Sequence, residues 1–130
     1  MIIDTSALVA LALREPEAER LAAAMVAAPI CWAAAVSWLE LRIVLESRMG
    51  PEAAAIAGEL LARFEIRRLN FDETQVAAAF LAWQHYGKGR HPARLNLGDC
   101  CAYAASVTTG EPLLFKGNDF AQTDVEAAVW

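Results

Sequence analysis

The feature that most constrains the fold is an alternation of short apolar stretches with helical patterns along all 130 residues. Strands are predicted at Met1–Ile3, Ile30–Ala34, Glu65–Leu69 and Pro112–Phe115, with a last edge strand at Val125–Val129. Helices are predicted at Ala7–Leu13, Glu17–Ala27, Ser37–Arg48, Glu52–Phe64 and Asp72–Tyr86, and a last helix begins at Asn96 or Asp99 and ends before Gly110. Strands that alternate with helices form βαβ units. We therefore predict an α/β fold, a three-layer α/β/α sandwich with a central parallel sheet of roughly four to five strands.

The composition predicts a single domain spanning residues 1–130, because 57% of the residues are hydrophobic and can fill one core. No apolar run reaches the roughly 18 residues of a membrane span, and the first residues lack the basic region of a secretory signal. The cysteines Cys31, Cys100 and Cys101 are odd in number, and two are adjacent, which is a poor disulfide framework. We expect a cytoplasmic protein that has reduced thiols and no contact with membranes.

The formal net charge is −5, which is the opposite of the basic surface usual in proteins that bind nucleic acid by bulk electrostatics. Any contact with nucleic acid must therefore be local. A bound metal ion could supply positive charge, and the acidic surface could attract a basic partner chain. The two histidines, His85 and His91, do not complete a zinc site.

Two acidic residues follow predicted strands. Asp4 ends the first strand, and Asp119 lies in the loop after the strand that contains Leu113 and Leu114. In open parallel sheets, ligands bind outside the carboxyl ends of the strands, at the point where the strand order reverses. Both positions also have plain structural explanations, since Asp4 could cap a helix and Asp119 could be a turn aspartate.

Glu40 lies in the middle of a predicted helix. Val36, Ile43 and Val44 share its side of the helix at spacings of i−4, i+3 and i+4. A carboxylate among apolar side chains is costly unless it is paired or bound to a cation, which favours a functional role. The alternative is that the helix packs through its other face and leaves Glu40 exposed.

Asp99 stands at the start of a helix that otherwise carries no charge, directly after Gly98. The glycine permits close approach of backbone or ligand, although a helix-capping role would also explain the aspartate. A doubly wound sheet can gather all four acids at one edge. Converging carboxylates without His or Cys partners are typical of Mg²⁺ or Mn²⁺ sites.

Four segments around these acids resemble the motifs of a known family, the PIN-domain superfamily, and in particular the VapC-type toxins of bacterial toxin–antitoxin modules. The segments are Met1–Ala10, Ser37–Glu40, Leu97–Cys100 and Leu114–Phe120, in the family's order and approximate spacing. The resemblance covers essentially the whole chain. It implies a PIN-like fold and a type II toxin that is inhibited by a cognate VapB-type antitoxin and forms a homodimer.

The resemblance also implies an endoribonuclease that uses Mg²⁺, with Mn²⁺ as a substitute, to hydrolyse phosphodiester bonds of single-stranded RNA. Carried over by position, Asp4, Glu40, Asp99 and Asp119 are the catalytic and metal-binding residues. Asn118 and Asp124 lie close enough to Asp119 to compete with it for the fourth motif. The family places a hydroxyl residue after the first aspartate, and Thr5 and Ser6 supply it; Ser6 is expected to orient a carboxylate or cap the helix.

The only dense basic segment is the loop that contains Lys88, Arg90, His91 and Arg94, just before Asp99. We predict that Arg90 and Arg94 contact RNA phosphates, although a solvated loop would have the same composition. The tryptophans Trp32, Trp38 and Trp83 are expected in the core or in an interface. The helical regions 14–28 and 50–64 are candidates for contact with a second copy or an antitoxin.

Two other classes of function fit parts of the sequence. A phosphotransfer protein, either a haloacid-dehalogenase-like phosphatase or a receiver domain, also places an aspartate after a parallel strand and uses Mg²⁺. The phosphatase requires a second aspartate where Ser6 stands, and a receiver domain would leave Glu40 unexplained. A binding protein that keeps the fold without the chemistry is the other alternative, and the presence of all four acids disfavours it.

Overall fold

The centre of the fold is a four-stranded parallel sheet with the order β3-β2-β1-β4, in a computed structural model that describes residues 1–130. The strands are β1 (Ile2–Ile3), β2 (Trp32–Ala34), β3 (Arg67–Leu69) and β4 (Leu113–Leu114). The register pairs Ile2 with both Trp32 and Leu113, and Trp32 with Arg67. The predicted parallel α/β architecture is confirmed.

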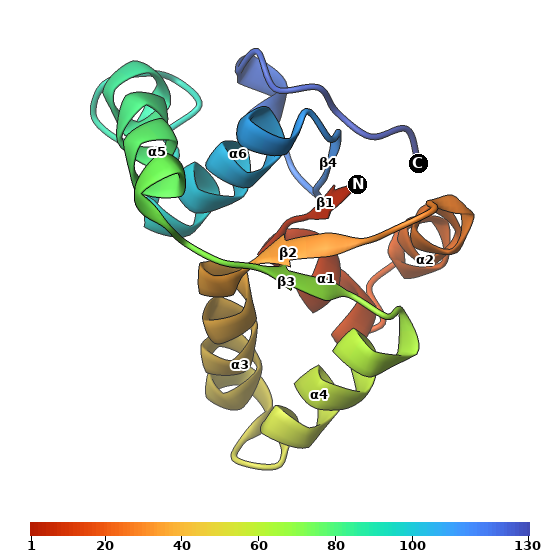
Figure 1. Cartoon of the computed structure of the whole chain (residues 1–130). Helices are drawn as coiled ribbons and strands as arrows, with labels where there is room; N and C mark the ends of the chain where they lie inside the picture. Colours follow the sequence, from red (N-terminus) through yellow and green to blue (C-terminus); the bar gives the residue numbers. More distant parts are fainter.

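Six helices cover the two faces of this sheet. The helices α5 and α6 lie on one face and α1 to α4 lie on the other, so that the sheet is the middle of three layers (Figure 1). None of the helices is both long enough and apolar enough to cross a bilayer. The bounds are α1 (Thr5–Ala12), α2 (Ala18–Ala27), α3 (Ala35–Met49), α4 (Ala53–Arg63), α5 (Glu73–Tyr86), α6 (Leu97–Thr109) and a 3₁₀ helix, η1 (Phe120–Gln122).

The strands separate two apolar cores because successive strand side chains point to opposite faces. Ile3 packs in the core beneath α1 to α4, whereas its neighbour Ile2 packs in the core beneath α5 and α6. Leu114 and Leu113 divide between the two cores in the same way. All four side chains are fully buried, so this alternation fixes the register of the central strands.

Polar side chains cap three of the six helices, at or close to the predicted positions. Asp72 caps α5 by accepting from the Gln75 amide at 3.0 Å, as predicted. Of the two alternatives for the start of α6, Asn96 is the cap. The first helix begins at Thr5, two residues before the predicted start, because Asp4 and not Ser6 is its N-cap.

Two expectations were wrong in detail. Residues 125–129 do not form a strand; they make one parallel bridge, in which Leu113 pairs with Ala127 beside β4. Because β4 itself has only two residues, it offers too short a template for a full edge strand. On α3, Ile43 does not belong to a buried stripe with Glu40 but is 56% exposed, since the buried face contains Ser37, Leu41 and Leu45.

Candidate active site

The candidate site lies where the strand order reverses. The chain runs from β1 outward through β2 to β3 and returns on the other side of β1 as β4. Asp4 follows β1 at this point, and its amide donates to the Leu114 carbonyl of β4 at 2.9 Å. The crevice outside the carboxyl ends of β1 and β4 is therefore the position at which a doubly wound sheet binds ligands.

The hydroxyl of Ser6 and the start of α1 hold Asp4 in place. Asp4 is only 3% exposed, and its Oδ2 accepts from the Ser6 amide at 2.8 Å and from the Ser6 hydroxyl at 2.5 Å. The Ser6 Oγ in turn accepts from the Lys116 amide at 3.0 Å, which connects Asp4 to the loop after β4. Burial raises the pKa of Asp4, and the nearby Glu40 carboxylate adds to this, although the bonds from Ser6 oppose it.

Glu40 reaches the same site from α3. The Thr5 hydroxyl donates to Glu40 Oε2 at 2.7 Å, so the two hydroxyl residues after Asp4 orient two different acids. The backbone of Gly98 lies directly against this carboxylate. A Cβ at Gly98 would stand 2.5 Å from Glu40 Oε2 and 2.8 Å from Oε1, so only glycine permits this approach. The expectation that Gly98 allows a close contact is confirmed, and the group that approaches is Glu40.

Asp99 is held by a reciprocal capping box at the start of α6. Its Oδ2 accepts from the Asn96 amide at 2.7 Å, and its own amide donates to Asn96 Oδ1 at 3.0 Å. Burial raises the pKa of Asp99 to about 6, and the negative charges of Asp4, Glu40 and Asp119 contribute. Asp99 therefore takes part in the cap of α6 and also lies near the negative charges of three other acids.

These three acids line one cavity of about 440 Å³. Polar side chains make up most of its wall, in contrast to the two apolar cores on either side of the sheet. The lining residues are Asp4, Thr5, Ser6, Val9, Glu15, Glu40, Val44, Arg48, Asn96, Asp99, Lys116 and Gly117. The structure thus brings together three of the four predicted acids.

The remaining site predictions lie outside this cavity. Asp119 is exposed just before η1 and does not line the cavity, although its charge still raises the pKa of Asp99. Arg90 and Arg94 line a separate shallow pocket of the loop between α5 and α6. The Arg90 guanidinium lies 4.0 Å from the centre of the Trp83 ring.

The donor atoms of the cavity suit a hard divalent cation. One oxygen each of Asp4, Glu40 and Asp99 accepts the hydrogen bonds described above, which leaves the other carboxylate oxygen of each residue without a protein donor. Oxygen-only donors of this kind are the preferred ligands of Mg²⁺ and Mn²⁺. As they stand, no three Asp, Glu, His or Cys side chains are placed to coordinate a single ion.

Three charged residues that line the cavity were not predicted from the sequence as site residues: Glu15, Arg48 and Lys116. The helical spacing offered a signal for Arg48, since it follows Glu40 by eight residues, or just over two turns. Lys116 and Glu15 offered none, because they are brought together from segments about 100 residues apart and bond at 2.7 Å.

The PIN-domain family model matches residues 1–126. The chain belongs to the PIN-domain family. Its curated relatives include a ribonuclease VapC from Mycolicibacterium smegmatis, 46% identical over 98% of each chain. Ribonuclease VapC30 from Mycobacterium tuberculosis is 44% identical over 96% of this chain and 95% of the relative. The predicted VapC-type resemblance is therefore confirmed, and this PIN-domain protein is a ribonuclease.

Solved structures agree on the fold. Mycobacterium tuberculosis VapC20, described as a sarcin–ricin-loop-cleaving toxin, superimposes with a TM-score of 0.77 at 20% identity, with 95% of each chain covered. FitAcB from Neisseria gonorrhoeae superimposes with a TM-score of 0.70 at 19% identity, covering 98% of this chain and 96% of that one. Membership in the PIN-domain family rules out the phosphatase and receiver-domain alternatives.

Proposed function

We propose that this PIN-domain ribonuclease is the toxin of a type II toxin–antitoxin module and that it cleaves single-stranded RNA internally with Mg²⁺ or Mn²⁺. The observation that supports the proposal best is the convergence of Asp4, Glu40 and Asp99 on one polar cavity, each with a free carboxylate oxygen. These three side chains would hold the ion. Asp119 would contribute from the rim, through water or after movement of its loop.

A divalent cation bound there would polarise the scissile phosphoryl group and activate a water for attack. The protein's own groups set up this chemistry. Thr5 and Ser6 fix the orientation of Glu40 and Asp4, so that little freedom is lost when the carboxylates bind the ion. Burial is the main cause of the raised pKa values of Asp4 and Asp99, and neighbouring negative charges add to it. A bound cation would offset those charges.

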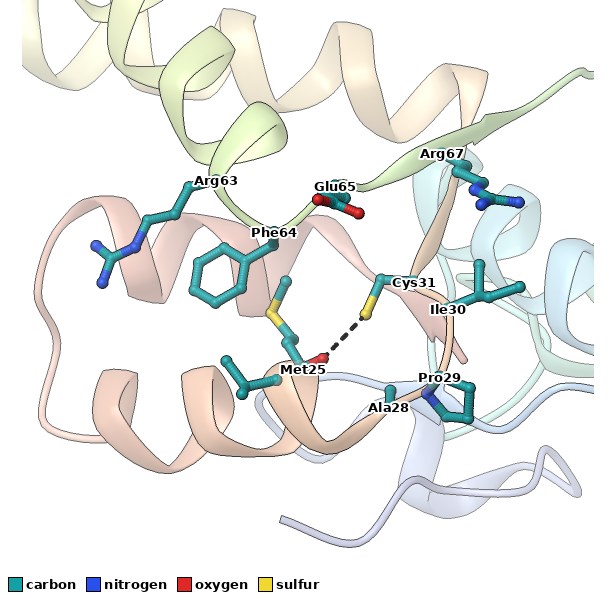
Figure 2. Close-up of a pocket in the computed structure, with 10 residues that line it drawn as sticks. Met25, Ala28, Pro29, Ile30, Cys31, Arg63, Phe64, Glu65 and Arg67 are labelled. Atoms are coloured by element: carbon teal, nitrogen blue, oxygen red, sulfur yellow. Dashed lines mark hydrogen bonds between the residues drawn. The ribbon is translucent and has the colours of Figure 1, made fainter.

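The cognate VapB-type antitoxin would bind at the groove where α2 and α4 end, which overlaps the ends of the helical regions 14–28 and 50–64 that the sequence predicts as contact surfaces. This cavity has a volume of about 340 Å³. Figure 2 shows Met25 and Phe64 at its centre and Arg63, Glu65 and Arg67 around them. On α2, Val26 borders it and is 76% exposed. An apolar centre with a charged rim is typical of a protein interface. One structural neighbour is a toxin–antitoxin complex from Klebsiella pneumoniae.

The homodimer would form through a second apolar surface, on α5 and the start of α6. Its cavity measures about 560 Å³ and is mostly apolar. The rings of Phe80 and Trp83 stack there at 5.9 Å, and Leu97 is 75% exposed. Large apolar side chains grouped at the surface mark interaction sites. Arg90 and Arg94 would contact RNA beside this surface. The protein would be located in the cytoplasm, where free thiols such as those of its three cysteines persist.

Cleavage of single-stranded RNA tests the enzymatic part of the proposal. The purified chain is expected to cut a broad mixture of RNAs when Mg²⁺ or Mn²⁺ is present and to lose this activity in EDTA. Asp4→Asn and Asp99→Asn should each lower the rate by roughly 100-fold or more, because each removes a charged ligand.

The matched control is Asp72→Asn. Asp72 also caps a helix, but it lies outside the cavity, and asparagine caps as well as aspartate. This variant should cleave RNA at the parent rate. Absence of cleavage on every RNA with either metal would instead support a non-catalytic binding protein.

A further inference from the structure

Arg48 occupies the far end of the acidic cavity. It lies in the last turn of α3 and shares one helix face with Glu40 and Val44, at successive spacings of four residues. All three side chains line the cavity. The rise of an α-helix places Arg48 about 12 Å along the axis from Glu40. The cavity therefore extends from the carboxylates along α3 to a guanidinium group.

Arg48 is the only cationic side chain of the cavity lining that forms no ion pair. Lys116, the other cation of the lining, bonds Glu15 at 2.7 Å and Glu17 at 2.8 Å, so its charge is already neutralised. Arg48 has no carboxylate within 4.0 Å, and the remaining ion pair of the chain joins the Met1 amine to Glu111. An unpaired guanidinium thus borders a cavity that contains four acidic side chains.

We propose that Arg48 binds a phosphate of the RNA strand next to the phosphate that is cleaved. This inference rests on the proposed function, since it assigns a substrate contact to the same site. An acidic protein must supply local positive charge to hold a polyanion, and arginine presents a planar pair of donors that fits phosphate oxygens. Arg48 acts here as a positioning residue that fixes the path of the strand along α3.

A cation in the last turn of a helix also stabilises the helix dipole, which would be a purely structural role. Arg42 separates the two roles. It lies on the same helix and is also exposed and free of ion pairs, but it borders a different pocket, with Leu39 and Ile43. Arg48→Met and Arg42→Met make the same chemical change, and methionine matches arginine in helix propensity.

The experiment measures RNA affinity as a function of salt concentration. Both substitutions are introduced into the full chain carrying Asp99→Asn, which suppresses cleavage, and binding of a fluorescent single-stranded RNA of mixed sequence is followed by anisotropy with Mn²⁺ present. Arg48→Met should weaken binding about tenfold, as expected for loss of one charged hydrogen-bonding contact. It should also reduce the slope of log K against log salt by about 0.7, the value for one phosphate contact on a single strand.

Arg42→Met should leave both the affinity and the slope unchanged, and Arg48→Lys should restore most of the slope. In the otherwise unsubstituted enzyme, Arg48→Met should raise KM more than it lowers kcat. Equal slopes for the Arg48 and Arg42 variants, or failure of the parent to bind RNA, would overturn the inference. If the unsubstituted chain cleaves RNA with metal while the two slopes are equal, the proposed function stands and only the assignment of Arg48 is wrong.

Discussion

At the scale of single residues, the site depends on a glycine as much as on its acids. The backbone of Gly98 touches the Glu40 carboxylate, so Gly98→Ala must displace that side chain. We expect roughly a 10- to 100-fold loss of cleavage, since small misplacements of active-site groups have effects of this size. Glycine-to-alanine changes within helices otherwise tend to stabilise a protein.

Gly58 provides the control for this prediction. It lies in α4, and a Cβ there would meet nothing within 4 Å. Gly58→Ala should raise the free energy of unfolding by about 0.5–1 kcal/mol and leave cleavage unchanged. Normal cleavage by Gly98→Ala would show that the position of Glu40 does not matter for catalysis.

The raised pKa of Asp99 predicts that the stability of the fold depends on pH. This pKa is raised to about 6 in the folded state, above the ordinary value of 3.8. Between about pH 4 and 6 the folded state therefore binds more protons than the unfolded state, and this group makes stability fall as the pH rises through that window. In metal-free protein at pH 8, Asp99→Asn should raise the free energy of unfolding by about 1–2 kcal/mol, allowing for solvent screening.

The advantage of Asp99→Asn should shrink as the pH falls below 6 and vanish below the ordinary pKa of 3.8, where the carboxyl group is protonated in both states. Asparagine retains an oxygen that can accept from the Asn96 amide, so the helix cap is preserved. Denaturant unfolding at several pH values, with and without saturating Mn²⁺, measures the effect. A stability difference that did not change with pH would contradict the raised pKa.

At the scale of the elements, α3 shows which face of a helix is buried when its sequence is apolar nearly all round. Leu41 is fully buried, whereas Ile43 is 56% exposed. Leu41→Ala should lower the free energy of unfolding by about 2–5 kcal/mol through loss of core packing. Ile43→Ala should change it by less than about 0.5 kcal/mol, as surface substitutions do. Similar losses for the two variants would mean that α3 is oriented differently.

The same helix shows why part of the site could not be predicted from the sequence. Asp4 and Asp99 were predictable because local sequence patterns reveal the end of a strand and the start of a helix. The carboxyl edge of the parallel sheet brings these two positions together. The orientation of α3 depends on contacts with α1 and α4 that no local pattern encodes. For this reason the predicted stripe with Ile43 was wrong, and the place of Arg48 in the same cavity as the acids was not predicted.

The C-terminal segment has a similar explanation. The apolar run Val125–Val129 looks like a strand by composition, but β4 ends at Leu114 and leaves only Leu113 for pairing. The loop that carries Asp119 begins just after Leu114, so its path depends on local turns and not on the sheet. The exposed position of Asp119 was therefore outside what strand and helix patterns can predict.

At the scale of the whole molecule, the proposed dimer assigns a role to the exposed apolar side chains of α5. Phe80 is 55% exposed, so Phe80→Glu can be introduced without disturbing the core. We expect the parent chain to be a dimer and Phe80→Glu to be a monomer, because a buried unpaired charge is costly at an interface. Light scattering at several protein concentrations measures this. Parent chains that remain monomeric, or a variant that remains dimeric, would exclude this face as the interface.

The proposed ribonuclease activity depends on a divalent cation held among the acids, and direct titration with Mn²⁺ tests this most simply. Calorimetry should show that the parent chain binds Mn²⁺ and that Asp72→Asn binds it equally well, whereas Asp4→Asn should bind at least about tenfold more weakly. Bound Mn²⁺ should also raise the unfolding temperature of the parent. Binding of Mn²⁺ by Asp4→Asn with the affinity of the parent, or no binding by the parent, would contradict the account.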